Sequence, residues 1–260
     1  MGQSSKIEWT DSTWNPVTGC TQVSPGCDHC YALALAQRRL RKVYLRREPV
    51  RLDESARSDP FSIRLWPERL LEPERWKPGR MILVNSMSDL FHAEIPEDYV
   101  RRLFEVMLRA DWHVYQILTK RPARAIRFMK RHAGMFPEST VPEHIWVGTS
   151  VENQRQAHRV EQLRRVGARV RFLSCEPILG PLQFDLEGIH WLIAGGESGR
   201  GFRPLNLDWV RELRDQCRAS RVPFFFKQVG GYTPKAGGRL LDGIEWSELP
   251  SVARSRLSAA

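Results

Sequence analysis

Residues 81–109 read MILVNSMSDLFHAEIPEDYVRRLFEVMLR. The first four, Met81 to Val84, are an uninterrupted apolar run, which is typical of a strand buried on both faces of a parallel sheet. A helical pattern then extends from Pro96 to Arg109. Its apolar residues recur at helical spacing: Val100, Leu103, Phe104 and Met107. The stretch therefore predicts one strand followed by one amphipathic helix.

The same alternation continues toward the carboxyl end. Strand patterns occupy residues 113–118, 145–148, 169–173, 191–194 and 223–226, and helical patterns occupy 122–132, 157–163 and 207–219. Alternating apolar strands and amphipathic helices imply a parallel sheet covered by helices. We predict an α/β fold in which six to eight units form a complete or partial parallel (β/α) barrel. A doubly wound open sheet stays an alternative, because periodicity alone does not separate the two.

The length fits a single domain over residues 1–260. We expect an exposed excursion over residues 46–60, which contain prolines and several charges, and a frayed tail from Leu249. An Ala-rich helix is expected near residues 33–43, with Leu33 and Val43 on its apolar face. No apolar run approaches the roughly 18 residues of a membrane helix, and the amino terminus lacks the apolar core of a secretory signal. These features predict a cytoplasmic protein with no membrane partner.

The chain is strongly basic, with 40 Lys and Arg against 30 Asp and Glu and a formal charge of +10. Such an excess would attract a polyanion or a phosphorylated substrate. A solvated surface with no ligand is the alternative interpretation. The charge therefore makes a nucleic acid or a nucleotide a candidate partner.

Three of the five cysteines lie in the segment Thr18–Tyr31, TGCTQVSPGCDHCY. Glycine and proline allow this segment to curl around a metal site, and the two-residue gap between Cys27 and Cys30 recurs in zinc and iron-sulfur ligation. Structural zinc usually takes four protein ligands. Cys20, Cys27 and Cys30 therefore suit an iron-sulfur cluster with one open iron, while structural zinc and plain thiols stay as alternatives.

The pattern Cys-x6-Cys-x2-Cys-Tyr resembles the radical S-adenosylmethionine (SAM) superfamily, whose commonest spacing is Cys-x3-Cys-x2-Cys. The whole chain resembles the phage-associated three-cysteine-motif family of unassigned function, DUF5131. The stretches that carry this second resemblance are WNPVTGC (14–20), NSMSDLF (85–91), LTKRP (118–122), VGTSVEN (147–153) and GGESG (195–199). Two features depart from the superfamily: the first gap is longer, and His29 stands where a large aromatic residue is usual.

The radical SAM resemblance implies a radical SAM-like fold and a [4Fe-4S] cluster held by Cys20, Cys27 and Cys30. It also implies that SAM chelates the fourth iron, that an electron donor reduces the cluster, and that a 5′-deoxyadenosyl radical abstracts a substrate hydrogen. His29 could stack on the adenine of SAM. The substrate would be a nucleic acid or a nucleotide. The alternative is a non-enzymatic nucleic-acid-binding protein with a structural zinc site.

Polar residues follow most of the predicted strands, where active sites of parallel α/β folds gather. We expect Asn85, Ser150 and Glu152 to contact SAM, because each follows a different strand. The cations at the strand ends are candidates for phosphate contacts: Lys120, Arg121 and Lys227. Cys175 also follows a strand, as a candidate catalytic hydrogen donor, a fourth ligand or an inert thiol. Capping of the next helix is the competing explanation for each polar residue.

Overall fold

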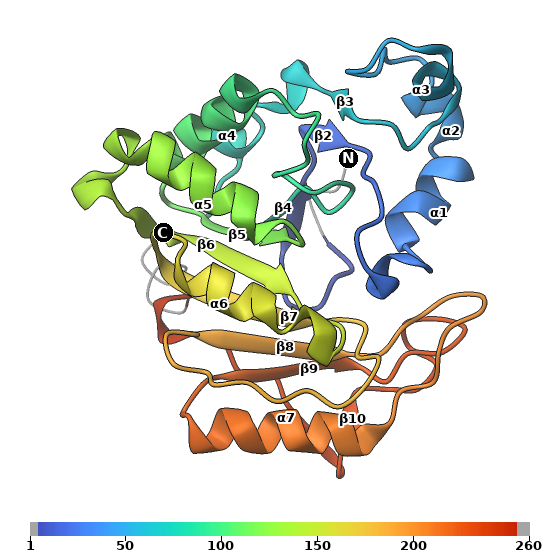
Figure 1. The fold of residues 1–260 in the computed structure, drawn as a ribbon, viewed down its shortest axis with the longest axis vertical. Helices are drawn as coiled ribbons and strands as arrows, with labels where there is room; N and C mark the ends of the chain where they lie inside the picture. The colour runs from blue at the N-terminus through green and yellow to red at the C-terminus, as the bar shows by residue number, and fades with distance from the viewer. Residues whose placement is uncertain (1–4, 254–260) are drawn as a thin grey trace.

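Seven parallel strands form one curved sheet in the computed structural model, which describes residues 5–253 (Figure 1). Across the sheet the strands keep their order in the chain. They are β1 (Ser12–Trp14), β4 (Met81–Val84), β5 (Val114–Thr119), β6 (Val141–Ser150), β7 (Ala168–Cys175), β8 (Trp191–Gly195) and β9 (Phe224–Gln228). Each strand pattern predicted from residue 81 onward is present.

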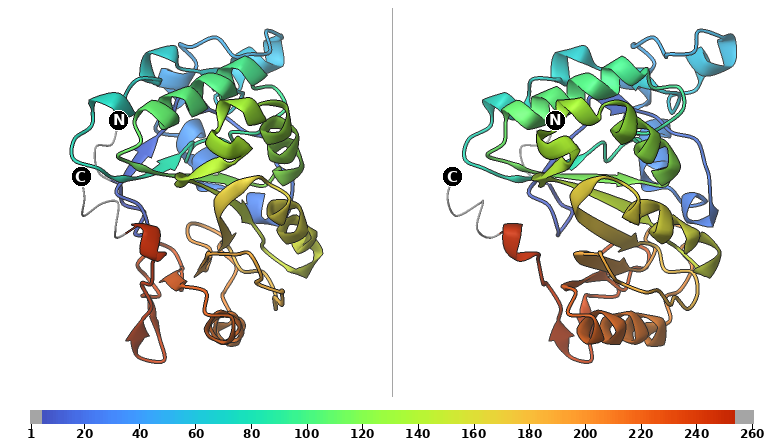
Figure 2. Two further views of the ribbon diagram at one scale, coloured as in Figure 1. Left: turned by 90° about the vertical axis from the view of Figure 1, so that its left-hand side faces the viewer. Right: turned by 60° about the vertical axis from the view of Figure 1, so that its left-hand side comes forward.

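Helices on the outer face of the sheet connect most of the successive strands from β4 to β9, and a segment without a helix joins β7 to β8. Right-handed crossovers that always advance in the same direction place every connecting helix on one face, and Figures 1 and 2 show this arrangement. The connecting helices are α4 (Glu97–Arg109), α5 (Pro122–Arg131), α6 (His158–Arg164) and α7 (Leu207–Ala219). Short 3-10 turns are η1 (Pro25–Cys27), η2 (Pro67–Arg69), η3 (Pro73–Arg75), η4 (Ala133–Met135), η5 (Pro137–Ser139) and η6 (Gln154–Gln156).

The sheet is a partial barrel. β1 and β9 stand at its two edges, and within residues 5–253 the two strands do not pair with each other. A complete barrel, one of the predicted forms, would need that pairing. A doubly wound sheet would reverse its strand order at a switch point, whereas this order runs in one direction. The partial parallel barrel is therefore the predicted form that the structure supports.

Alternating side chains build a separate core on each face of the sheet. The outer face packs Ile82, Ile117 and Val147 against the helices. On the inner face, aromatic side chains predominate: Trp146, Phe172, Trp191 and Phe225. The rings of Trp146 and Trp191 meet with centroids 5.7 Å apart. These four aromatic side chains, called the aromatic floor below, fill the inner face of the sheet up to the level of the carboxyl ends of the strands.

The segment between β1 and β4 covers the carboxyl end of the sheet. It contains the antiparallel pair β2 (Val17–Thr18) and β3 (Arg64–Leu65), and the helices α1 (Tyr31–Gln37), α2 (Arg41–Tyr44) and α3 (Glu54–Ser58). The helix expected near residues 33–43 is interrupted. Because the chain turns between α1 and α2, Val43 is 43% exposed and the buried residue is Tyr44.

The exposed excursion of residues 46–60 is fastened by the fully buried side chain of Arg64. Its guanidinium donates hydrogen bonds to four backbone carbonyls at distances of 2.8 to 3.3 Å. The acceptors belong to Arg47, Ala56, Asp59 and Ser62. One buried arginine therefore replaces the apolar core that this polar segment lacks.

A hairpin of β10 (Leu240–Leu241) and β11 (Ile244–Glu245) follows β9. The tail was expected to fray from Leu249, but its described part is packed: Leu249, Val252 and Ala253 contact the inner-face core that includes Trp9. These apolar residues provide the contacts that the prediction overlooked, and the rest of the tail lies outside the described residues. Over residues 5–253, no helix combines the length and the apolar character needed to cross a membrane.

Candidate cysteine-loop site

The cysteine loop, defined here as residues 19–30, joins β2 to α1 at the carboxyl end of the sheet. Gly19 begins it with φ +94, and a Cβ at this position would lie 2.2 Å from the carbonyl oxygen of Ser62. The amide of Gly19 donates to the carbonyl of Met87 over 3.0 Å, and the amide of Cys20 donates to that of Phe61 over 3.1 Å. Glycine is therefore required where the loop leaves β2, because the two backbones approach so closely.

Cys20, Cys27 and Cys30 are free thiols of intermediate exposure. Cys20 and Cys30 both pack against the apolar cluster around α1, which includes Met87. Burial, followed by the nearby carboxylate of Asp89, raises the pKa of Cys20 to about 11. No set of three or more His, Cys, Asp and Glu side chains within residues 5–253 is arranged to hold a single metal ion. The structure thus places the three thiols on one loop at the sheet edge.

Glu152 fastens the middle of this loop. Its side chain is 0% exposed, and its Oε1 accepts a hydrogen bond from the hydroxyl of Ser24. Arg159 donates to its Oε2 over 2.9 Å, and Lys120 Nζ lies 3.7 Å from Oε1. A Cβ added to Gly26 would lie only 2.3 Å from Glu152 Cγ. Glu152, predicted to contact SAM, is thus bonded to the loop that carries the thiols.

Glu197, which follows β8, fastens the end of the loop. Nδ1 of His29 donates to its Oε2 over 2.8 Å. Arg203 binds the same carboxylate in a fork, at 3.0 Å through Nε and 2.6 Å through Nη2, and also donates to the carbonyl of Pro25 over 2.9 Å. Burial opposes ionisation of Glu197, but the bonds from Arg203 and His29 outweigh it and hold the pKa below the usual value. The ring of His29 is therefore fixed beside the last two cysteines.

Residues that follow β4 and β5 fasten the start of the loop. Arg121 donates from Nη2 to the carbonyl and the hydroxyl of Thr21, over 3.1 and 2.9 Å. The same hydroxyl lies 2.9 Å from Nε2 of His92. Asp89 accepts from the hydroxyl of Thr119 over 2.7 Å and lies 3.8 Å from Arg121. Arg121 and Lys120, predicted to bind substrate phosphate, therefore both contact groups of this chain.

Polar side chains occupy the carboxyl ends of β6 and β7 on the inner face of the sheet. Ser150 of β6 lies opposite Ser174 of β7, on the face that carries Trp146 and Phe172. Glu176 accepts from the hydroxyl of Ser174 over 3.1 Å, and Lys227 Nζ lies 2.8 Å from its Oε1. Lys227 is thus paired with a carboxylate, while Ser150 stands directly above the aromatic floor.

Asn85 is the strained member of this edge. It has φ 59 and is 3% exposed. Its Oδ1 accepts from the amide of Val17 over 3.3 Å, but its buried Nδ2 has no hydrogen-bond partner among the described residues. A non-glycine residue in the left-handed region with an unsatisfied buried donor is a feature of functional sites. The Nδ2 of Asn85 is therefore a buried donor that the described residues leave unsatisfied.

Cys175 does not join the site. It ends β7, as expected, but side chains alternate along a strand, so Cys175 points to the helix side while Ser174 points inward. It is 0% exposed, and burial, followed by the proximity of Cys217, raises its pKa well above the usual value. Of the roles considered for Cys175, this position in the outer-face core fits the inert thiol best.

Sequence reasoning missed two arginines that hold the site together, Arg159 and Arg203. Arg159 is 5% exposed and lies one turn before the buried Leu163 on the same face of α6. A charged residue at an inward position of an amphipathic helix was a signal that it pairs with a buried acid. No comparable signal marks Arg203, whose partners are distant in the sequence except for Glu197.

A family model matches residues 4–250, with the description "Protein of unknown function (DUF5131)". The chain belongs to the DUF5131 family. The match confirms the family prediction over nearly the whole chain. No curated protein and no solved structure matches this DUF5131 member.

Proposed function

We propose that this DUF5131 protein is a radical SAM-type enzyme in which Cys20, Cys27 and Cys30 hold a [4Fe-4S] cluster. One observation carries the proposal: three free thiols stand on one loop at the carboxyl edge of a parallel sheet, fastened there by groups that follow different strands. Active sites of parallel α/β folds form at this edge. The substrate would be a nucleic acid or a nucleotide.

The thiols fit this group by their number and chemistry. They are free, and the remaining cysteines, Cys175 and Cys217, are buried in the outer-face core. Three sulfur ligands leave one iron of the cluster for SAM. A single zinc ion needs its ligands at one point, with sulfur at about 2.3 Å, whereas the cysteines of a cluster ligate separate irons. Three thiols are one short of the four protein ligands that structural zinc usually takes, so their number favours the cluster over zinc.

The bound cofactors would supply the reductive cleavage of SAM, with an electron from a separate donor, to a carbon radical that abstracts a substrate hydrogen atom. The chain's own residues orient and enclose the reactants. Glu152, Glu197 and Arg121 hold the loop at three points. The aromatic floor of the inner face excludes water from below.

Polar groups above this floor would bind SAM. Asn85 offers its unpartnered amide donor, and Ser150 stands at the inner end of β6. His29, whose ring Glu197 fixes, is the candidate for contact with the adenine. Glu152 would act through the loop, as a positioning residue.

Metal analysis after anaerobic purification and reconstitution tests the proposal. Iron and sulfide should be present, and Cys20→Ala, Cys27→Ala and Cys30→Ala should each abolish the visible absorbance of the cluster. Cys217→Ala is the matched control and should keep it. Calorimetry should detect SAM binding to the reconstituted protein and lose it in the three variants.

One zinc ion without sulfide would refute the proposal and favour the non-enzymatic zinc protein. Equal binding of SAM to the apoprotein would contradict ligation to the cluster.

A further inference from the structure

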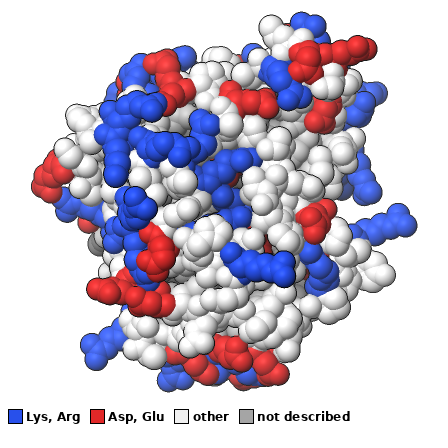
Figure 3. Space-filling model, in the orientation of Figure 1, with Lys and Arg blue, Asp and Glu red and all other residues white. Residues whose placement is uncertain are grey.

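One face of α5 carries a row of arginines that begins at the cysteine loop. Arg121 immediately precedes the helix, and Arg124, Arg127 and Arg131 follow on it. Figure 3 shows basic side chains gathered over the region of α4 and α5. Because an α-helix rises 1.5 Å per residue, Arg127 lies about 9 Å along the axis from Arg121. That length corresponds to two or three stacked nucleotides at about 3.4 Å each.

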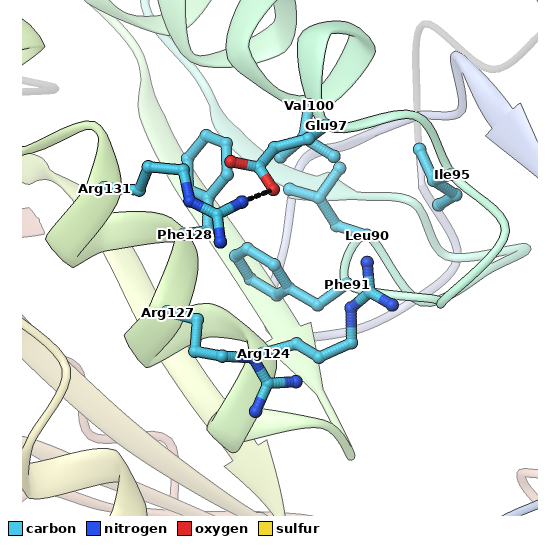
Figure 4. Close-up of a pocket in the computed structure, with 9 residues that line it drawn as sticks. All are labelled: Leu90, Phe91, Ile95, Glu97, Val100, Arg124, Arg127, Phe128 and Arg131. Carbon is cyan, nitrogen blue, oxygen red and sulfur yellow. Dashed lines mark hydrogen bonds and ion pairs between the residues drawn. The ribbon is translucent and has the colours of Figure 1, made fainter.

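A cavity of about 220 Å³ lies between this row and α4. Leu90, Phe91 and Phe128 provide apolar walls, and Arg124 and Arg127 stand at its margin (Figure 4). At the other end Arg131 is bonded to Glu97, as Figure 4 shows. The cavity thus combines apolar surface with guanidinium groups, the combination that receives a base or sugar beside its phosphates.

The two central arginines have no compensating partner. The side chains of Arg124 and Arg127 make no hydrogen bond or ion pair with another described residue, whereas that of Arg131 pairs with Glu97. Burial, followed by the positive charges of Arg127 and Arg121, lowers the pKa of Arg124. Glu97 also lines the cavity, but its carboxylate is already bonded to Arg131 and His132. A bound anion would therefore stabilise the two cations crowded at the margin of the cavity.

The cations at the sheet edge are in a different state. Lys120 lies 3.7 Å from Glu152, Arg121 lies 3.8 Å from Asp89, and Lys227 lies 2.8 Å from Glu176. A single nucleotide at the loop would therefore meet cations that are already paired. The charge that has no partner lies farther along α5, at Arg124 and Arg127, within reach of phosphates up to about two or three nucleotides from Arg121.

We propose that Arg124 and Arg127 bind the phosphate backbone of a single-stranded nucleic acid, with the cavity beside them receiving a base or sugar. The strand would continue past Arg121, which contacts Thr21 next to Cys20, to the cysteine loop. Binding of the strand at Arg124 and Arg127 is independent of the proposed function. That the bound strand is also the substrate, so that a nucleotide within a polymer reacts, rests on the proposed function.

Charge reversal with a matched control tests this inference. Arg124→Glu with Arg127→Glu should weaken binding of a fluorescent single-stranded DNA or RNA oligonucleotide by about tenfold or more. The slope of log affinity against log salt should fall by about 1.4 to 1.8, since each lost phosphate contact removes about 0.7 to 0.9. Arg165→Glu with Arg218→Glu changes the net charge equally at exposed positions elsewhere and should have a smaller effect.

Arg124→Gln with Arg127→Gln, which removes the charges without adding carboxylates, should also weaken binding, at an unchanged denaturation midpoint. Equal losses from the α5 pair and the control pair would overturn the inference, as would the absence of binding to either oligonucleotide at low salt. Two outcomes separate the two proposals.

If the wild type binds the oligonucleotide but no cluster, the proposed function fails and the α5 site stands. If the wild type holds the cluster and SAM but both charge-reversal pairs bind alike, the α5 site fails and the proposed function stands.

Discussion

Gly26 packs so closely on Glu152 that an added methyl group should displace the cysteine loop. In Gly26→Ala the new Cβ would lie 2.3 Å from Cγ and 2.6 Å from Oε1 of Glu152, whereas carbon atoms prefer about 3.5 to 4.0 Å. Glu152 has no room to retreat, because its side chain is 0% exposed and Arg159 holds it at 2.9 Å. The loop must therefore move by about 1 Å, and overpacking of this kind costs about 1–3 kcal/mol.

Urea and thermal denaturation measure this cost. At about 2–4 °C per kcal/mol for a chain of this size, the Tm of Gly26→Ala should fall by about 2 to 12 °C. Gly134→Ala is the matched control in another 3-10 turn: a Cβ there meets nothing within 4 Å, so its stability should be unchanged or slightly higher.

A double-mutant cycle isolates the contact. Glu152→Ala alone should destabilise the protein by about 3–5 kcal/mol, because Arg159 loses its buried counter-charge. In that background Gly26→Ala no longer meets the carboxylate side chain and should cost little, which gives a coupling energy of about 1–3 kcal/mol. An equal cost of Gly26→Ala in both backgrounds would refute the argument that Glu152 fastens the loop.

Three further perturbations test other parts of the structure. Cys175→Ser should lower the free energy of unfolding by about 1–3 kcal/mol, because a hydroxyl replaces a thiol in an apolar core, and should leave the iron content unchanged; loss of iron would place Cys175 at the site. Burial lowers the pKa of His113 below 6.5. Below about pH 6.5 the His113 side chain is therefore protonated more in the unfolded chain than in the folded one, and stability decreases as the pH decreases. The Tm of His113→Gln should fall less than that of the wild type between about pH 7 and pH 5, and an equal fall would contradict this assignment. Arg64→Leu should speed hydrogen exchange over residues 46–60, since four carbonyls lose their donor; unchanged protection would show that other contacts hold the excursion.

The sheet was predictable because strands buried on both faces leave an apolar signal. Met81–Val84 and Trp191–Gly195 are buried throughout, so their composition alone marks them as strands. The closure of the barrel leaves no such signal. Whether β1 reaches β9 depends on the curvature and stagger of all the strands together, and no single residue encodes it.

The site was predictable in its position and not in its contacts. Polar residues after the strands indicated the edge, and the spacing of Cys20, Cys27 and Cys30 indicated the loop. The bonds between them join residues far apart: Ser24 and Glu152 are separated by 128 positions, and Arg203 and Pro25 by 178. Local patterns carry no information on such pairs, so nothing in the sequence indicated that Glu152, expected to contact SAM, is bonded to the loop.

The separation of His29 and Glu197 in the sequence, 168 positions, also determines the order in which they are synthesised. At about 5–20 residues per second, the thiols leave the ribosome roughly 10 to 30 seconds before the carboxylate that fixes the end of their loop. A nascent chain in that interval exposes unfastened cysteines to oxidants and to competing metals. In the proposed function, cluster insertion would therefore belong to the finished protein, and expression conditions that delay oxidation should raise the fraction of chains that can be loaded.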